Sequence, residues 1–390
     1  MLPYIKFNIS TNGLGQNSAD IQKIPGLVIT GATVADKATI GKSYQIFSLQ
    51  EAKDLGVEET GTNAFAYKHI KAFYDYAGSN AELWFMLISD ATTMTSALDK
   101  DSGVAKQLIA DAGGNIRVLG IVKQPTGTPT ITNGLDADVT TAVEKAQALA
   151  DDFADKYFPF RIIMSGNNFS GVSTALKDYV EDGNYNRVSI LLANTDGGAD
   201  AAIGLALGRL ASIPVQRNIG RVRDGAVENT AAFFTSGGKV ESLSAQWNAI
   251  NDKGYIFLQN YVGRSGFYFS DDPTLTQVDD DFKTLANGFV MDKAVLLAYD
   301  VLLDYLKDEV PINTDGTIHP AIIKSWQAAI DTQIRSLMVN AGELSDVQVK
   351  IEANQNVVST GQILISIALL PVGYAKYITV NIGFTTNTEA

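Results

Sequence analysis

Both ends of the chain show a regular alternation of apolar and polar residues. Near the N-terminus, the apolar residues Ile5, Phe7 and Ile9 alternate with Tyr4, Lys6 and Asn8. Near the C-terminus, Ile378, Val380, Ile382 and Phe384 alternate with Tyr377, Thr379 and Asn381. A period of two residues places one set on each face of an extended strand. The pattern therefore predicts an amphipathic strand at each end.

The middle of the chain alternates between two kinds of segment. Short β-branched or aromatic runs, which predict strands, lie at residues 83–88, 116–122, 160–164 and 187–192. Amphipathic stretches, which predict helices, lie at residues 64–77, 139–157 and 199–211. Strands that alternate with helices favour a largely parallel sheet covered by helices. We therefore expect an α/β layer structure here.

The last third of the chain follows a different pattern. Residues 255–258 and 267–270 flank a glycine-containing turn at residues 263–266, which predicts a hairpin. Two long helices are predicted at residues 282–306 and 320–341, the second starting at Pro320 and ending before Gly342. Strands follow at residues 347–351 and 363–370, and the continuous apolar run of the latter is typical of a central strand.

A stretch rich in glycine, asparagine and serine, residues 10–18, separates the first strand from the body, and such a composition is typical of a flexible connector. The predicted fold is a mixed α/β and α+β chain of two domains with extended β-strand arms. The predicted division is an N-terminal arm and linker at 1–20, an α/β region at 21–250, a C-terminal domain at 251–374 and a C-terminal arm at 375–390.

Composition and charge narrow the function classes. The chain has 390 residues, 46% of them hydrophobic, which is enough for two domains with sizeable cores. Its net charge of −13 disfavours contact with nucleic acid or an anionic membrane surface. The lack of cysteine excludes disulfides and thiolate metal sites. No membrane span is expected, since the longest apolar run, residues 363–372, is too short. No secretory signal is expected either, since the N-terminus alternates polar and apolar residues and lacks a basic region followed by an apolar block.

One segment is close to a phosphate-binding motif. Residues 36–43 match the pattern G-x-x-x-x-G-K-S except that Asp36 replaces the first glycine. A carboxylate at that position would repel phosphate, and the motif must run into a helix, whereas the residues after Ser43 predict a strand. A polar surface turn is favoured, and nucleotide binding is the alternative. A second glycine-containing segment, residues 13–15, lacks the third glycine of a dinucleotide fingerprint and is expected to be linker.

Other polar residues have ordinary structural explanations. His69 lies in a predicted helix and His319 precedes a predicted helix, and two isolated histidines do not indicate a metal centre or a serine–histidine site. The acidic residues at 271–272 and 279–281 fit helix capping and turns better than a calcium loop. Arg217, Arg221 and Arg223 could bind an anion, but in so acidic a chain salt links to a neighbouring subunit are favoured. We predict no catalytic, cofactor-binding or metal-binding residue.

The last third resembles the C-terminal domain of contractile tail-sheath proteins, which occur in phage tails and contractile injection systems. Three features carry the resemblance: the glycine-led aromatic segment that ends in Thr274-Leu275, the two long helices, and the final order of strand, Pro371 and strand. The resemblance covers about 130 residues of the chain.

The resemblance implies a sheath-type subunit that polymerises as a helix or a stack of rings around a tail tube protein and contracts. Baseplate and tail-terminator proteins are the further partners that it implies. No nucleic acid, membrane or cofactor is expected as a binding partner of this chain. It implies a location in a virion tail or injection-system sheath assembled in the bacterial cytoplasm. The residues implied to join the sheets of adjacent subunits are Tyr4, Ile5, Phe7 and Ile9 in the N-terminal arm and Tyr377, Ile378, Val380, Ile382 and Phe384 in the C-terminal arm.

Three alternatives stay open from the residues alone. Both end strands could pair within their own chain as ordinary sheet edges. The chain could be an α/β enzyme or nucleotide-binding protein that uses residues 36–43. It could also be a static tail, tube or surface polymer.

Overall fold

The computed structural model describes residues 23–380, which form two compact units. The first unit ends at Tyr299 and the second begins at Asp300. Helix α9 (Leu285–Leu303) crosses this division. The region predicted as residues 251–374 contributes to both units, and the predicted domain ranges stay a prediction.

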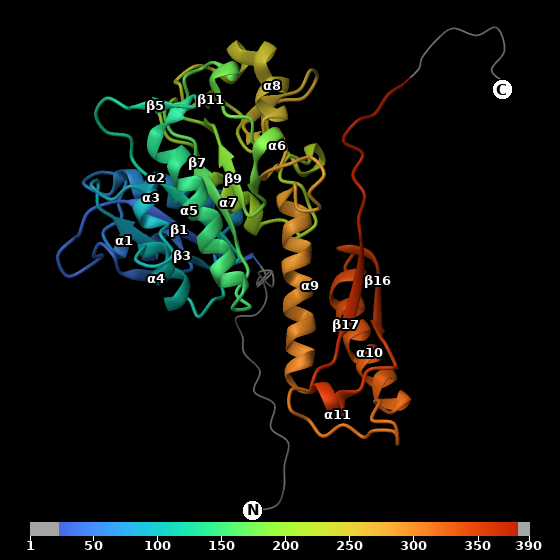
Figure 1. The fold of residues 1–390 in the computed structure, drawn as a ribbon. Helices are drawn as coiled ribbons and strands as arrows, with labels where there is room; N and C mark the ends of the chain where they lie inside the picture. Colours follow the sequence, from blue (N-terminus) through green and yellow to red (C-terminus); the bar gives the residue numbers. More distant parts are fainter. Residues whose placement is uncertain (1–22, 381–390) are drawn as a thin grey trace, which may run out of the picture. The chain divides into compact units, whose positions relative to one another are not determined.

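The first unit is built on a seven-stranded sheet with the strand order β12-β9-β7-β4-β1-β3-β2 (Figure 1). All neighbouring pairs are parallel except β2 and β3, which are antiparallel. The largely parallel sheet predicted from the sequence is therefore confirmed. The strands are β1 (Pro25–Thr30), β2 (Ser43–Ile46), β3 (Leu83–Ile88), β4 (Val118–Val122), β7 (Arg161–Ser165), β9 (Val188–Leu191) and β12 (Tyr255–Ile256).

Helices cover both faces of this sheet (Figure 1). Helices α2 (Ala64–Ala77) and α7 (Ile203–Ala211) pack on each other and on β1, while α4 (Val104–Asp111) contacts β1 and β3 and α5 (Ala137–Ala154) contacts β7 and β9. Every residue of β1, β4, β7 and β9 is buried, as expected for parallel strands with both faces covered. The three helices predicted in this region are confirmed, with shifted ends for α5 and α7.

Short elements complete the first unit. The short helices are α1 (Leu49–Asp54), α3 (Met94–Ala97), α6 (Tyr179–Asp182) and α8 (Trp247–Asp252), with 3-10 turns at Ser173–Ala175, Val222–Asp224 and Val240–Gln246. The short strands are β5 (Ile131–Thr132), β6 (Leu135–Asp136), β8 (Asn184–Tyr185), β10 (Ala193–Asn194), β11 (Phe233–Phe234), β13 (Leu258–Asn260), β14 (Phe267–Phe269) and β15 (Leu275–Thr276). Strands β13 and β14 form the predicted hairpin, but Tyr255 and Ile256 belong to the main sheet instead.

A buried lysine, Lys23, attaches the first described residues to helix α7. The Lys23 ammonium donates to the carbonyl oxygens of Leu210 (3.2 Å), Ile213 (2.6 Å) and Pro214 (2.7 Å). These carbonyls lie at and just beyond the end of α7, where the helix dipole favours a positive charge. The segment that follows the predicted N-terminal arm is thereby attached to α7.

The second unit packs one helix against a two-stranded sheet. Helix α10 (Pro320–Ile334) begins at Pro320, with the His319 side chain accepting from the Ala321 amide, and continues into a π-helical turn (Arg335–Val339). The antiparallel strands are β16 (Leu344–Ile351) and β17 (Ile365–Pro371), and a short helix, α11 (Val357–Thr360), connects them. Ile318, Ile323, Trp326 and Ile351 form one buried hydrophobic cluster of this unit.

Candidate functional site

Strand β17 has an incompletely covered apolar surface. Within the described residues it pairs only with β16, in a register that runs from Ile351 opposite Ile365 to Leu344 opposite Pro371. None of its residues is fully buried, and Leu370 is 58% exposed. Leu364, immediately before the strand, is 63% exposed. The central strand predicted for this run is thus an edge strand in the described part of the chain, and such an edge can accept a further strand.

The described part of the predicted C-terminal arm is exposed. Residues 372–380 form neither helix nor strand. Three of the predicted interaction residues lie here, and their exposed fractions are 90% for Tyr377, 78% for Ile378 and 74% for Val380. The other predicted interaction residues lie outside the described residues: Tyr4, Ile5, Phe7, Ile9, Ile382 and Phe384. Their role in subunit contacts stays a prediction.

A buried ion-pair network ties the beginning of α9 to the sheet. Arg161, at the start of β7, donates from Nε to Asp292 Oδ2 (3.0 Å), and Arg187 donates from NH1 to Asp292 Oδ1 (3.1 Å). Arg161 and Asp292 are 1% and 4% exposed. Gly288, one turn before Asp292, lies against the Arg161 guanidinium. A Cβ atom at this position would overlap the guanidinium, so the close contact requires glycine. The network holds α9 close to the strand, with each buried charge paired.

The acidic residues beside α9 act as caps and turn formers, as predicted. Asp272 Oδ2 accepts from the Ala286 amide (3.0 Å) in the first turn of the helix, and Asp280 Oδ1 accepts from the Phe282 amide (2.7 Å). Among the described residues, no group of three potential ligands is arranged to hold a metal ion.

The arginine cluster pairs inside its own chain. Arg217 NH1 and Arg221 NH1 lie 3.5 Å and 2.9 Å from Asp224 Oδ1. Each of these two side chains therefore has an acceptor within its own chain, and the predicted salt links to a neighbouring subunit stay a prediction. Arg223 is exposed.

Residues 36–43, whose sequence nearly matches a phosphate-binding motif, form a turn. Asp36 and Gly41 have positive φ angles of 60° and 76°, and the chain continues directly into strand β2 at Ser43. A phosphate-binding loop of this type presents the amides of a following helix, which is not the element found here. The predicted polar surface turn is confirmed.

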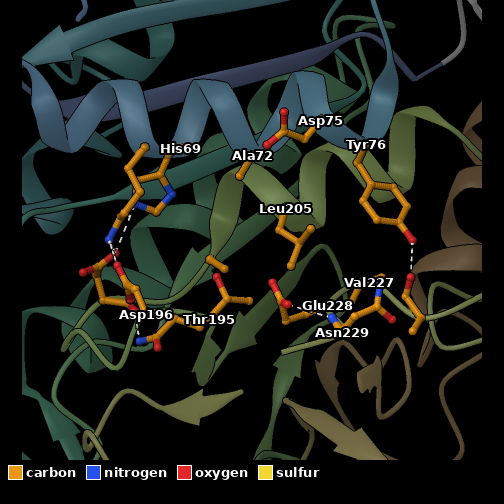
Figure 2. Close-up of a pocket in the computed structure, with 15 residues that line it drawn as sticks. His69, Ala72, Asp75, Tyr76, Thr195, Asp196, Leu205, Val227, Glu228 and Asn229 are labelled. Atoms are coloured by element: carbon orange, nitrogen blue, oxygen red, sulfur yellow. Dashed lines mark hydrogen bonds and ion pairs between the residues drawn. The ribbon is translucent and has the colours of Figure 1, made fainter. Parts of the chain in front are cut away.

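A cavity of about 330 Å³, lined by both polar and apolar residues, lies between α2, α7 and two loops (Figure 2). At one end, the buried His69 of α2 places Nε2 3.1 Å from Asp200 Oδ2, and its Nδ1 accepts from the Gly204 amide (3.4 Å). Lys68 donates to Asp200 Oδ2 (2.8 Å) and to Asp196 Oδ2 (3.0 Å). Since Nδ1 accepts, the proton of neutral His69 lies on Nε2 and is donated to Asp200.

Charge and burial set the protonation of this cluster. Burial lowers the pKa of His69 below its usual value, despite the nearby carboxylate of Asp200. Burial alone would lower the pKa of Lys68 and raise the pKa of Asp200. Their ion pair and hydrogen bonds outweigh burial, so that the pKa of Lys68 is raised and the pKa of Asp200 is lowered. The cluster thus holds a neutral imidazole, an ammonium and a carboxylate near pH 7.

We expect stability to decrease as the pH falls below about 6.5, because unfolded His69 then takes up a proton that the folded protein excludes. One such group changes the free energy of unfolding by up to about 1.4 kcal/mol per pH unit. Urea unfolding between pH 7.5 and 5.5 measures this slope. The variant His69→Gln should have a smaller slope than the parent protein, whereas equal slopes in the two proteins would contradict the assignment. The carboxylate of Asp200, with its lowered pKa, adds a loss of the same sign only below about pH 4.

Two family models together match nearly the whole chain. The first, described as the DUF2586 N-terminal domain, matches residues 2–273, and the second, described as the DUF2586 C-terminal domain, matches residues 281–389. The chain belongs to the DUF2586 family. No curated protein matches it.

This DUF2586 protein is similar over its full length to chains of solved contractile assemblies. A chain of the anti-feeding prophage baseplate gives a TM-score of 0.63 at 15% identity, covering 99% of both chains. A chain of the anti-feeding prophage helical sheath in the contracted state gives 0.62 at 15% identity, again covering 99% of both. A chain of the PVC sheath complex, from an extracellular contractile injection system in the contracted state, gives 0.59 at 16% identity and covers 100% of this chain and 99% of that one.

The resemblance predicted from the last third of the sequence is confirmed at the level of the fold, and it extends to the α/β region. The mixed α/β fold class is confirmed by the same likeness. No helix in the described range 23–380 has the length and apolar character needed to span a membrane.

Proposed function

We propose that this DUF2586 protein is a non-enzymatic structural subunit of a contractile sheath. In this proposal it polymerises around an inner tube and contracts to drive the tube through a target cell envelope. The observation that carries the proposal is the likeness, over 99% of both chains, to a chain of a helical sheath in its contracted state. Contraction would be a change from one lattice of subunits to a tighter one, without nucleotide.

Strand exchange between subunits is the proposed basis of polymerisation. The open edge of β17 and the exposed apolar residues Ile378 and Val380 are complementary partners for this exchange. Burying about four apolar side chains contributes about 6–12 kcal/mol, while ordering about eight residues costs about 8–16 kcal/mol. One arm is thus marginal alone, but two arms and a body contact reinforce each other because each attachment raises the local concentration for the next.

The proposal includes partners and a location. A tail tube protein would lie inside the polymer, and baseplate and tail-terminator proteins would bind its two ends. The particle would be a virion tail or an injection-system sheath assembled in the bacterial cytoplasm. Attachment of the N-terminal part of α9 to the sheet through Asp292 supports a first unit that moves as one piece while the arms keep neighbouring subunits connected.

Negative-stain electron microscopy tests polymerisation through the arms. The intact chain and a variant lacking residues 1–18 are purified and imaged after concentration. Hollow cylinders or stacked rings are expected from the intact chain and none from the truncated one, because the truncation removes one of the two strands that connect neighbouring subunits.

Two other outcomes would redirect the proposal. Monodisperse monomers from both proteins under assembly-promoting conditions would argue against a polymer. A polymer from the intact chain that shows a single lattice under all conditions would favour a static tail or surface polymer over a contractile sheath.

A further inference from the structure

The cavity between α2 and α7 has an apolar middle and polar ends. Leu205 lies between the group around His69 and Asp196 and the pair of Glu228 and Asn229, as Figure 2 shows. The remaining apolar lining includes Ala72 of α2 and Ala226. Such a surface can receive the aliphatic stem of a long charged side chain, whose head then reaches a polar end.

The loop that carries Glu228 is fixed in place. Arg209 donates to the carbonyl oxygens of Ile219 (3.2 Å) and Asp224 (3.3 Å), and the Tyr76 hydroxyl donates to that of Ala226 (2.9 Å). Glu228 Oε1 accepts from the amides of the next two residues, both at 2.7 Å. The carboxylate is thus positioned before any ligand arrives, which lowers the entropic cost of binding.

Negative charge exceeds positive charge in the cavity. Asp75, Asp196, Asp200 and Glu228 contribute four carboxylates to the lining, whereas Lys68 contributes one ammonium. Lys68 pairs with Asp196 and Asp200, and Asp75 pairs with Lys71, which lies outside the lining. His69 adds no charge while it is neutral. Among residues 23–380, no lysine or arginine forms an ion pair with Glu228. A cation that enters the cavity would therefore find an oriented carboxylate and an excess of negative charge.

We propose that this cavity binds the lysine or arginine side chain of a protein partner. The apolar middle suits the methylene stem, and the carboxylate at either end, Glu228 or Asp196, suits the charged head. The net charge of −13 favours a basic partner. This inference is independent of the proposed sheath function, since a monomer would have the same cavity.

Saturation-transfer NMR tests the proposal, because it detects binding to monomers and polymers alike. The probes are N-acetyl-arginine methylamide and N-acetyl-lysine methylamide, with the uncharged N-acetyl-norleucine methylamide as the control. Both cationic probes should bind more tightly than the control. The double variant Glu228→Gln/Asp196→Asn should weaken both by about tenfold or more, since each change removes the charge from an acceptor.

A matched variant separates this site from a general charge effect. Glu241→Gln/Asp252→Asn removes the same two charges from exposed positions outside the cavity lining and should leave binding unchanged. Equal loss in both double variants would overturn the proposal in favour of long-range attraction. It would also be overturned if neither cationic probe bound, if the norleucine probe bound as tightly, or if the cavity variant bound normally.

Discussion

Replacing Asp292 by alanine should lower the free energy of unfolding by about 3–5 kcal/mol, because it leaves Arg161 buried without its counter-charge. Arg187 would lose the same partner. Since α9 is fixed to β7 through this carboxylate, its N-terminal part should also become exposed to hydrogen exchange. Chemical denaturation gives the free energy, and amide exchange over residues 285–299 gives the local effect.

The control for this variant is Asp151→Ala. Asp151 also pairs with Arg187, at 3.4 Å, but its side chain is 52% exposed, so its loss should cost less than about 1 kcal/mol. If the two substitutions lowered the free energy of unfolding equally, the ion-pair network around Asp292 would not be what holds α9 to β7. A double variant, Arg161→Met/Asp292→Leu, should recover part of the stability, because it removes both buried charges together.

The double substitution Ile378→Asp/Val380→Asp should abolish polymerisation and leave the folding of the monomer unchanged. Both side chains are largely exposed in the single chain, so the substitution removes no buried contact there. In a neighbour's sheet they would contribute about 3–6 kcal/mol together, which corresponds to a loss of more than a hundredfold in association. Sedimentation measures the polymer, and thermal unfolding of the unassembled protein measures the fold.

The matched control for the arm is Thr379→Asp/Asn381→Asp. It adds the same charge to the same segment, but on the predicted polar face of the strand. Polymerisation should persist in this variant. If both double variants assemble normally, the C-terminal arm does not hold subunits together; if both fail, the added charge rather than the apolar face is responsible.

Much of the fold could be predicted because its signals are local. The continuous apolar run at residues 83–88 and the amphipathic stretch at 64–77 coincide with β3 and α2 at both ends. The hairpin prediction started too early, since Tyr255 and Ile256 pair with β9, a strand more than sixty residues earlier in the chain. Periodicity carries no information about which distant strand will be the neighbour.

The charged sites were not predictable in the same way. Arg161 and Asp292 are 131 residues apart in the sequence, as are His69 and Asp200. Nothing local distinguishes these side chains from surface charges, and only the packing of α9 on β7 and of α2 on α7 brings the partners together. Gly288 and Gly204 allow the close approach of helix and neighbour in the two places, yet an isolated glycine within a helical pattern predicts no particular partner.

A cryo-EM reconstruction of the polymer assembled from the intact chain tests the central claim most directly. The account predicts that residues 4–9 and 377–384 form strands in the sheets of adjacent copies, beside β16 and β17. It would be contradicted by a reconstruction in which both end segments pair within their own chain and neighbouring copies touch only through their bodies.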